Sequence, residues 1–326
     1  MIFGVRDDEL AIYDSLNKTL GMEIAFAKGF LSIDTVQTTK GFDAVLILTN
    51  CRIDDTIAAQ LADCGVRYIL SRAAGTDHID LKAVARHGLQ AANVPFYSAG
   101  AVSEHTVMLL LMVLRRARQA LHMVDAHDFT LTGLRGRELR NLTVGVFGAG
   151  RIGAETIRLV SGFGARVLVS SLEMSDETRR IATPVSREAL FSQSDVLIFH
   201  CGLSEDTRHI INKASIATLR DGVVLVNTAR GGLLDHAAVL EGLKSGKIAG
   251  FAMDVYEDES SFMRKNLGEN ALPDPVFAQL LMMENVIFTA HMSFFTDTAI
   301  ANMIAVSLQN AAEYDKTGRC QNELTR

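Results

Sequence analysis

The chain has 326 residues, a length typical of two domains that each bury a core. Apolar residues make up 48% and charged residues 21%, a balance that excludes intrinsic disorder. The formal net charge is −6, and no run of lysine or arginine exceeds two residues. A large phosphate-facing surface is therefore not expected, and nucleic acid is not a predicted partner.

Neither a membrane segment nor an export signal is evident. The apolar run Thr106–Leu114 is too short to span a bilayer, and the N-terminus carries acidic residues where a signal peptide needs basic ones. The four cysteines form no CxxC pair and have no metal-ligand spacing. We therefore expect reduced thiols, no metal, no membrane partner and a cytoplasmic location.

Short β-rich runs alternate with amphipathic segments along the first hundred residues. The expected strands are Ile2–Val5, Ala44–Leu48 and Tyr68–Ser71, and the expected helices are Leu10–Leu20, Thr56–Cys64 and Leu81–His87. This alternation predicts βαβ units and a parallel sheet.

A strand and turn at Ala91–Tyr97 lead into one long predicted helix, Val102–Val124, after which the alternation restarts. The later strands are expected at Leu142–Phe147, Val167–Ser170, Val196–His200 and Val223–Asn227, and a last helix at Asp297–Tyr314. Few proline and glycine residues lie between the two α/β modules, so their junction is predicted to be a hinge, not a flexible linker.

A G-x-G-x-x-G sequence follows the first strand of the second module and opens the predicted helix Arg151–Phe163. Its glycines are Gly148, Gly150 and Gly153. The first permits a tight turn, the second lets the backbone approach a pyrophosphate, and the third lets helix and strand pack closely. Together with the N–H groups of the helix start at Arg151 and Ile152, this arrangement predicts dinucleotide binding.

The position that usually carries an acidic residue for the cofactor ribose is Ser171, at the end of the second strand. A serine neither repels the extra phosphate of NADP nor firmly holds the ribose diol. Glu173 is near enough to substitute, and Arg179 and Arg180 could meet a phosphate. NAD(H) is therefore the expected cofactor, with NADP(H) possible.

Three polar groups each follow a predicted strand of the second module, namely Arg230, Glu259 and His291. In a doubly wound sheet, ligands bind at the carboxyl ends of the strands. Hydride transfer to a ketone needs a cation for a substrate carboxylate, an acid for the carbonyl oxygen, and a carboxylate that keeps this acid charged. The three residues supply such a set.

The order of GAGRIG, the NTARG run ending at Arg230, the acidic pair Asp254 and Glu259, and His291 resembles the D-2-hydroxyacid dehydrogenase family over essentially the whole chain. The length of the segment from Ser260 to Glu284 resembles the D-lactate dehydrogenase-like branch.

The resemblance implies a role for each matching residue. His291 matches the general acid/base, Glu259 its partner, and Arg230 the guanidinium that clamps the 2-oxo acid. On the substrate side, the implied residues are Ala74, Gly75 and the wall tyrosine Tyr97. On the cofactor side, they are Ala229 and Asp254, the latter at the nicotinamide carboxamide.

The resemblance also implies an architecture of two doubly wound parallel-sheet domains, Rossmann-like or flavodoxin-like, with a cleft between them. Residues 1–98 and 293–326 would form the substrate domain, and residues 99–292 the dinucleotide-binding domain. A homodimer through the cofactor domains is expected, with the helix Val102–Val124 as a plausible interface.

The activity implied is reduction of a small 2-oxo acid, pyruvate first, to the D-2-hydroxy acid with NADH. A branched-chain or aromatic 2-oxo acid is the alternative, and an NADH-sensing scaffold without turnover is a minor one. Ala290, where the family usually has proline, and Phe295, where the lactate branch often has tyrosine, mark a divergent member.

Overall fold

The computed structural model describes residues 1–27, 29–268, 272 and 274–325. The chain folds into two compact units, and the first is built from both ends of the chain: Met1–Ser98 with Phe295–Arg326. The second unit is the continuous stretch Ala99–Phe294. The prediction of doubly wound α/β folds with parallel sheets is confirmed.

The first unit contains three strands and four helices among its described residues. They are β1 (Ala44–Ile47), β2 (Tyr68–Ser71), β3 (Gln90–Ala92), α1 (Leu10–Leu20), α2 (Asp55–Asp63), α3 (Leu81–Arg86) and α12 (Asp297–Thr317). All strand pairs are parallel, in the order β1-β2-β3. Parallel bridges from Ile2 to Phe26 and to Leu46 extend this order to the flavodoxin-like arrangement.

The expected strand Ile2–Val5 is reduced to the bridges at Ile2. Gly4 has a φ of 66°, which turns the chain out of the extended conformation. A side chain there would also press on Leu48, since a Cβ at Gly4 would lie 2.9 Å from its Cδ1 atom. The prediction of a four-residue strand was therefore wrong, although its sheet position was right.

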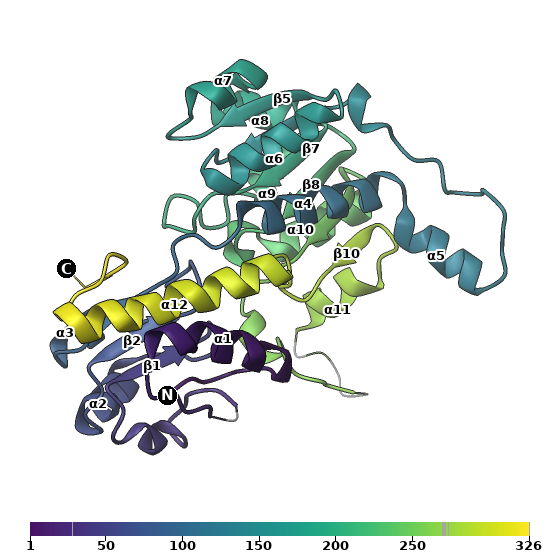
Figure 1. Ribbon diagram of the computed structural model, residues 1–326. Coiled ribbons are helices and arrows are strands. Elements are labelled where there is room, and N and C mark those ends of the chain that lie inside the picture. The colour runs from purple at the N-terminus through teal and green to yellow at the C-terminus, as the bar shows by residue number, and fades with distance from the viewer. Residues whose placement is uncertain (28, 269–271, 273, 326) are drawn as a thin grey trace. The chain divides into compact units, whose positions relative to one another are not determined.

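Both faces of the first sheet are covered, as the apolar strand sequences require. Val45, Ile47 and Ile69 pack with the buried residues of α2 and α3. On α12, Tyr314 stacks on Tyr68 of β2 with ring centroids 4.3 Å apart, and α1 packs beside α12 (Figure 1).

The second unit contains a seven-stranded parallel sheet within its described residues. Its strands are β4 (Thr143–Phe147), β5 (Arg166–Ser170), β6 (Thr183–Pro184), β7 (Val196–Phe199), β8 (Val223–Asn227), β9 (Ile248–Met253) and β10 (Val286–Phe288). The helices are α4 (Ala99–Leu114), α5 (Ala117–Asp125), α6 (Arg151–Gly162), α7 (Asp176–Ile181), α8 (Arg187–Gln193), α9 (Lys213–Thr218), α10 (His236–Ser245) and α11 (Pro275–Met282). The spatial order β10-β9-β8-β7-β4-β5-β6 is the Rossmann order with one further strand.

Alternate residues of each strand in this sheet enter two separate cores. On β7, Val196 and Ile198 pack with α4 and α6, whereas Leu197 and Phe199 pack with helices from α8 to α11. This period of two explains why the strands read as continuous apolar runs in the sequence. The carboxyl ends of all these strands lie at one edge of the sheet.

The single long helix expected at Val102–Val124 is instead two helices, α4 and α5. The carbonyl of Leu114 accepts a hydrogen bond from the N–H of Arg137 at 2.9 Å in place of one from the next helical turn. Arg116 then adopts the left-handed conformation, with a φ of 51°. Figure 1 shows α5 and the extended segment after it standing out from the body of the second unit.

The second crossing between the units lies after Phe294, two residues beyond the expected boundary. The N–H of Ser293 donates to the carboxylate of Asp254 at 2.9 Å, which ties this residue to the second unit. In the part of the chain that the structure describes, no helix has both the length and the apolar character needed to cross a bilayer.

Candidate active site

The glycine-rich turn between β4 and α6 is shaped by close backbone approaches. Gly148 has a φ of 98°, and a Cβ there would lie 2.8 Å from the backbone nitrogen of Cys201. A Cβ at Gly153 would overlap the carbonyl oxygen of Gly148. Gly150, by contrast, has open space where its Cβ would point, and it caps α6 without a side chain. This cradle fits a pyrophosphate at the start of α6, beside Arg151 and Ile152.

His200 supports this turn from β7. The backbone N–H of His200 donates to the carbonyl of Phe147 at 2.8 Å. Its ring nitrogen Nε2 lies 2.8 Å from the Thr156 hydroxyl on α6. Burial lowers the pKa of His200 to about 4, so the ring is neutral at pH 7. His200 therefore joins the helix to the sheet.

Ser171 lies next to the glycine turn, as the sequence predicts. Its hydroxyl accepts a hydrogen bond from the N–H of Ala149 at 2.9 Å and donates to the carbonyl of Glu173 at 2.7 Å. Position 171 thus contacts the turn directly and brings no charge to it.

Arg230 follows β8 in a loop that its own neighbours shape. The side-chain oxygen of Asn227 accepts from the N–H of Ala229, and its amide donates to the carbonyl of Arg230. The Arg230 guanidinium donates to the carbonyl of Ala229 at 2.8 Å. A Cβ at Gly231 would overlap the backbone of Tyr256, so this loop lies against the segment that follows β9.

Glu259 and His291 are brought together from the ends of β9 and β10. One carboxylate oxygen of Glu259 bonds to Nδ1 of His291, and the other accepts the N–H of Tyr256 at 2.8 Å. His291 has a φ of 50°, rare for a residue with a side chain. Its carbonyl accepts a hydrogen bond from the Arg264 guanidinium at 2.6 Å.

Asp254 is fully buried at the end of β9 and holds the His291 loop. Its carboxylate accepts hydrogen bonds from the Thr289 hydroxyl at 2.6 Å and from the N–H groups of Met292 and Ser293, each at 2.9 Å. Its carbonyl accepts the N–H of His291 at 2.8 Å. These contacts assign Asp254 a supporting role that the sequence did not predict.

The predicted substrate residues Ala74, Gly75 and Tyr97 belong to the first unit. The carbonyl of Ala74 accepts the side-chain amide of Asn93 at 2.7 Å. The carbonyl of Tyr97 accepts the side-chain amide of Asn302, on α12, at 2.7 Å. Both segments are therefore anchored within this unit, Tyr97 by a side chain of the C-terminal helix.

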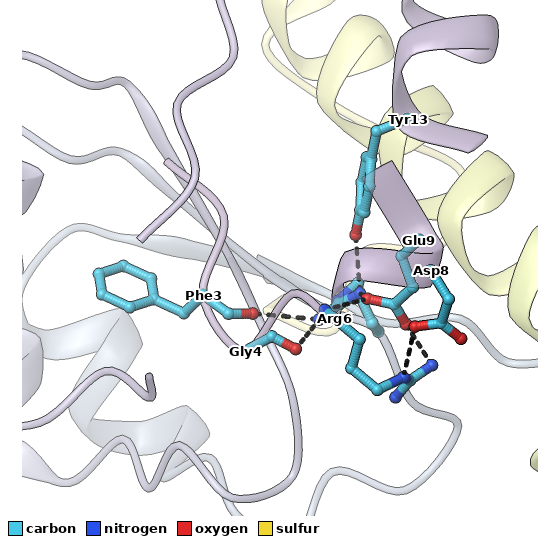
Figure 2. Close-up of polar contacts among 7 residues, drawn as sticks. Phe3, Gly4, Arg6, Asp8, Glu9 and Tyr13 are labelled. Carbon is cyan, nitrogen blue, oxygen red and sulfur yellow. Dashed lines mark hydrogen bonds and ion pairs between the residues drawn. The ribbon is translucent and has the colours of Figure 1, made fainter. Parts of the chain in front are cut away.

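The loop that contains Ala74 and Gly75 starts at a buried arginine. The Arg72 guanidinium donates to the carboxylate of Glu9 at 3.1 Å, to the Tyr13 hydroxyl at 2.7 Å and to the carbonyl oxygens of Phe3 and Gly4. Figure 2 shows these acceptors converging from the N-terminal segment and the start of α1. The entrance to the loop is thus fixed by one buried ion pair and by hydrogen bonds to four oxygen atoms in all.

Sequence reasoning missed three supporting side chains: Asn93, Asn227 and Thr289. Asn227 and Thr289 each follow the apolar core of a strand and precede a predicted site residue by three and two positions. A polar residue at the carboxyl end of a buried strand was the available signal.

Comparison with known proteins identifies the family. Residues 107–293 match the family described as D-isomer specific 2-hydroxyacid dehydrogenase, NAD binding domain. An aromatic 2-oxoacid reductase of Clostridium sporogenes is 36% identical over 99% of this chain and 98% of that protein. A D-lactate dehydrogenase of Escherichia coli is 33% identical over the same shares.

A solved structure of D-2-hydroxyisocaproate dehydrogenase is 34% identical, with a TM-score of 0.89 over 100% of this chain and 99% of that one. The glycine cradle before α6 fits the NAD-binding description of the matched family. The chain belongs to the D-isomer specific 2-hydroxyacid dehydrogenase family and is an NAD-dependent oxidoreductase that acts on a CH–OH group.

Proposed function

We propose that this enzyme reduces a small 2-oxo acid, pyruvate first, to the D-2-hydroxy acid. The observation that carries the proposal is the bond between Glu259 and Nδ1 of His291, in the unit that contains the glycine cradle. With Nδ1 held by the carboxylate, Nε2 is the ring nitrogen that gives its proton to the substrate oxygen. NADH, when bound, supplies the hydride.

The predicted residues that would contact the substrate each have a proposed task. Arg230 binds the substrate carboxylate and polarises the ketone, for which a planar guanidinium is better suited than an ammonium group. Backbone N–H groups at Ala74 and Gly75 bind the carboxylate, and Tyr97 contacts the substrate. Accordingly, the first unit is proposed as the substrate domain and the second as the cofactor domain.

An aromatic or branched-chain 2-oxo acid is the second candidate substrate. The 36% identity to an aromatic 2-oxoacid reductase favours it, and so does Phe295 at a position where the resemblance leads us to expect tyrosine. Phe295 contacts the Arg6 guanidinium, which lies 4.4 Å from the ring centroid.

The test is NADH oxidation with pyruvate, 2-oxoisocaproate, phenylpyruvate and 2-oxoglutarate, followed by analysis of product chirality. We expect the highest kcat/KM with pyruvate and a D product. His291→Gln should lower kcat at least about 100-fold while NADH still binds. Wild-type turnover in His291→Gln, or an L product, would refute the proposed mechanism, and a preference for phenylpyruvate would select the second substrate.

A homodimer and a cytoplasmic location also belong to this proposal. All four cysteines are free thiols, and Cys51, Cys64 and Cys320 are buried in the first unit. Free thiols of this kind suit a reducing compartment. The surface proposed for the dimer is α5 with the segment that follows it.

A further inference from the structure

Behind His291 lies a chain of hydrogen bonds that ends on another histidine. Asp254 accepts the hydroxyl of Thr289, and Nε2 of His105 lies 2.9 Å from the same hydroxyl oxygen. His105 belongs to α4, whereas Asp254 and Thr289 follow β9 and β10. The side chain of His105 is 10% exposed and that of Asp254 is 0% exposed.

The direction of each hydrogen bond follows from the groups involved. A carboxylate only accepts, so the single hydroxyl proton of Thr289 goes to Asp254. Thr289 must therefore accept from His105, whose Nε2 carries a proton. Burial lowers the pKa of His105, against the attraction of Asp254, so at neutral pH this ring is the neutral Nε2–H tautomer.

The chain matters because the His291 loop is strained. A residue other than glycine with a φ of 50° persists only when its surroundings hold it there. Asp254 stabilises this conformation with two groups. Its carbonyl accepts the His291 N–H, and its carboxylate accepts the N–H groups of Met292 and Ser293. The orientation of that carboxylate is in turn set by Thr289, and the orientation of Thr289 by His105.

We propose that His105 is a positioning residue for the reaction, which acts through Thr289 and Asp254 to hold the imidazole of His291 in its productive orientation. The inference rests on the proposed role of His291. The neighbouring contact on α4, between the hydroxyls of Thr106 and Thr228 at 2.7 Å, ties the same helix to the loop of Arg230. The same turn of α4 therefore contacts both the segment that leads to His291 and the segment that leads to Arg230.

Two amide substitutions separate positioning from packing. The amide nitrogen of His105→Gln reaches the place of Nε2, whereas that of His105→Asn, with the same chemistry, falls short. We expect His105→Asn and Thr289→Val each to lower kcat about tenfold, with KM for the 2-oxo acid and the Kd for NADH changed less than about threefold. His105→Gln and Thr289→Ser should retain most of kcat.

The double variant His105→Asn/Thr289→Val decides whether the two residues act as one chain. If they do, its kcat equals that of the worse single variant, because the second change breaks a chain already broken. Multiplicative losses, or equal losses in His105→Gln and His105→Asn, would overturn the inference.

A readout without turnover keeps this test separate from the proposed function. The proton on Nδ1 of His291, bonded to Glu259, should give a downfield NMR signal that disappears in His291→Gln. We expect this signal to broaden in Thr289→Val and His105→Asn and to stay sharp in His105→Gln. A sharp signal in all of them would overturn the inference, whereas lack of 2-oxo acid reduction by the wild type would refute only the proposed function.

Discussion

Ser171 is the residue on which we expect cofactor choice to depend. Its hydroxyl already bridges Ala149 and Glu173, so it places a neutral group where an acidic residue would repel the 2′-phosphate of NADP. We expect Ser171→Asp to keep an acceptor for the Ala149 N–H and to raise the NADH over NADPH preference in kcat/KM at least about tenfold.

The matched control for that prediction is Ser171→Ala, which removes the hydroxyl and adds no charge. Its NADH to NADPH ratio should stay near the wild-type value. If the alanine and aspartate variants changed the ratio equally, loss of the hydroxyl and not charge would determine cofactor choice.

Arg72 is expected to contribute to the stability of the fold, because its charge is buried. Without the Arg72 guanidinium, Glu9 would keep only Arg6 as an ion-pair partner, and the Tyr13 hydroxyl and two backbone carbonyls would lose their donor, at a cost of about 3–5 kcal/mol. Arg72→Met should therefore lower the free energy of unfolding, measured by urea denaturation, by about this amount. Arg67→Met, which breaks an exposed pair with Asp43, should cost less than about 1 kcal/mol. Equal costs would mean that the burial of Arg72 is not what matters.

The proposed catalytic residues could be placed at one edge of the sheet from the sequence, because each follows an apolar strand and parallel strands end at the same edge. The supporting role of Asp254 was not predictable in this way. Its partners Thr289, Met292 and Ser293 become neighbours only through the turn after β10, which a left-handed residue, His291, makes possible. Nothing in the identity of a histidine signals a positive φ.

At the scale of elements, strands β4, β5, β7 and β8 of the second unit were correctly predicted, since both faces of the sheet are buried there and each of these strands is an apolar run. The prediction of a single helix at Val102–Val124 was wrong, because two helices, α4 and α5, take its place. The periodicity of this segment continues through Leu114, and the break comes from Arg137, which lies far along the chain and takes the Leu114 carbonyl. Sequence periodicity carries no information about such a long-range competitor for a backbone acceptor.

Two buried histidines at element junctions make the stability of the second unit depend on pH. His200 joins the end of β7 to α6, and His236 begins α10 and packs against Tyr256 with tilted rings whose centroids lie 4.2 Å apart. Burial lowers the pKa of each to about 4. Between pH 4 and 6.5 the unfolded chain binds more protons than the folded one, so stability falls as the pH falls through this window.

His236→Phe tests this dependence, because phenylalanine keeps the ring against Tyr256 and removes the titration. The variant should lose less free energy of unfolding than the wild type between pH 7 and pH 4, by up to about 3 kcal/mol. Urea denaturation at several pH values measures it. Parallel stability curves for the two proteins would show that His236 does not contribute.

For the whole molecule, each unit has a core of its own, and the chain returns to the first unit through α12. The resemblance implied this return, whereas the apolar pattern of Asp297–Tyr314 could not say where the helix packs. The partner is identified by Tyr314, which stacks on Tyr68 and whose hydroxyl donates to the carbonyl of Ala91. Contacts between residues more than two hundred positions apart are what a single sequence does not reveal.

The predicted homodimer is tested on the segment that projects from the second unit. Helix α5 has no buried residue in the single chain, yet it exposes Leu121, and the segment after it exposes Phe129 at 75% and Leu131 at 83%. Adjacent exposed large apolar side chains mark an interaction surface.

Phe129→Ser/Leu131→Ser should weaken the dimer at least about 30-fold in sedimentation equilibrium. Leu172→Asp, which changes a fully exposed residue outside this segment, should leave the dimer intact. A monomeric wild type would contradict the homodimer, and an unchanged dimer in the double variant would place the interface elsewhere.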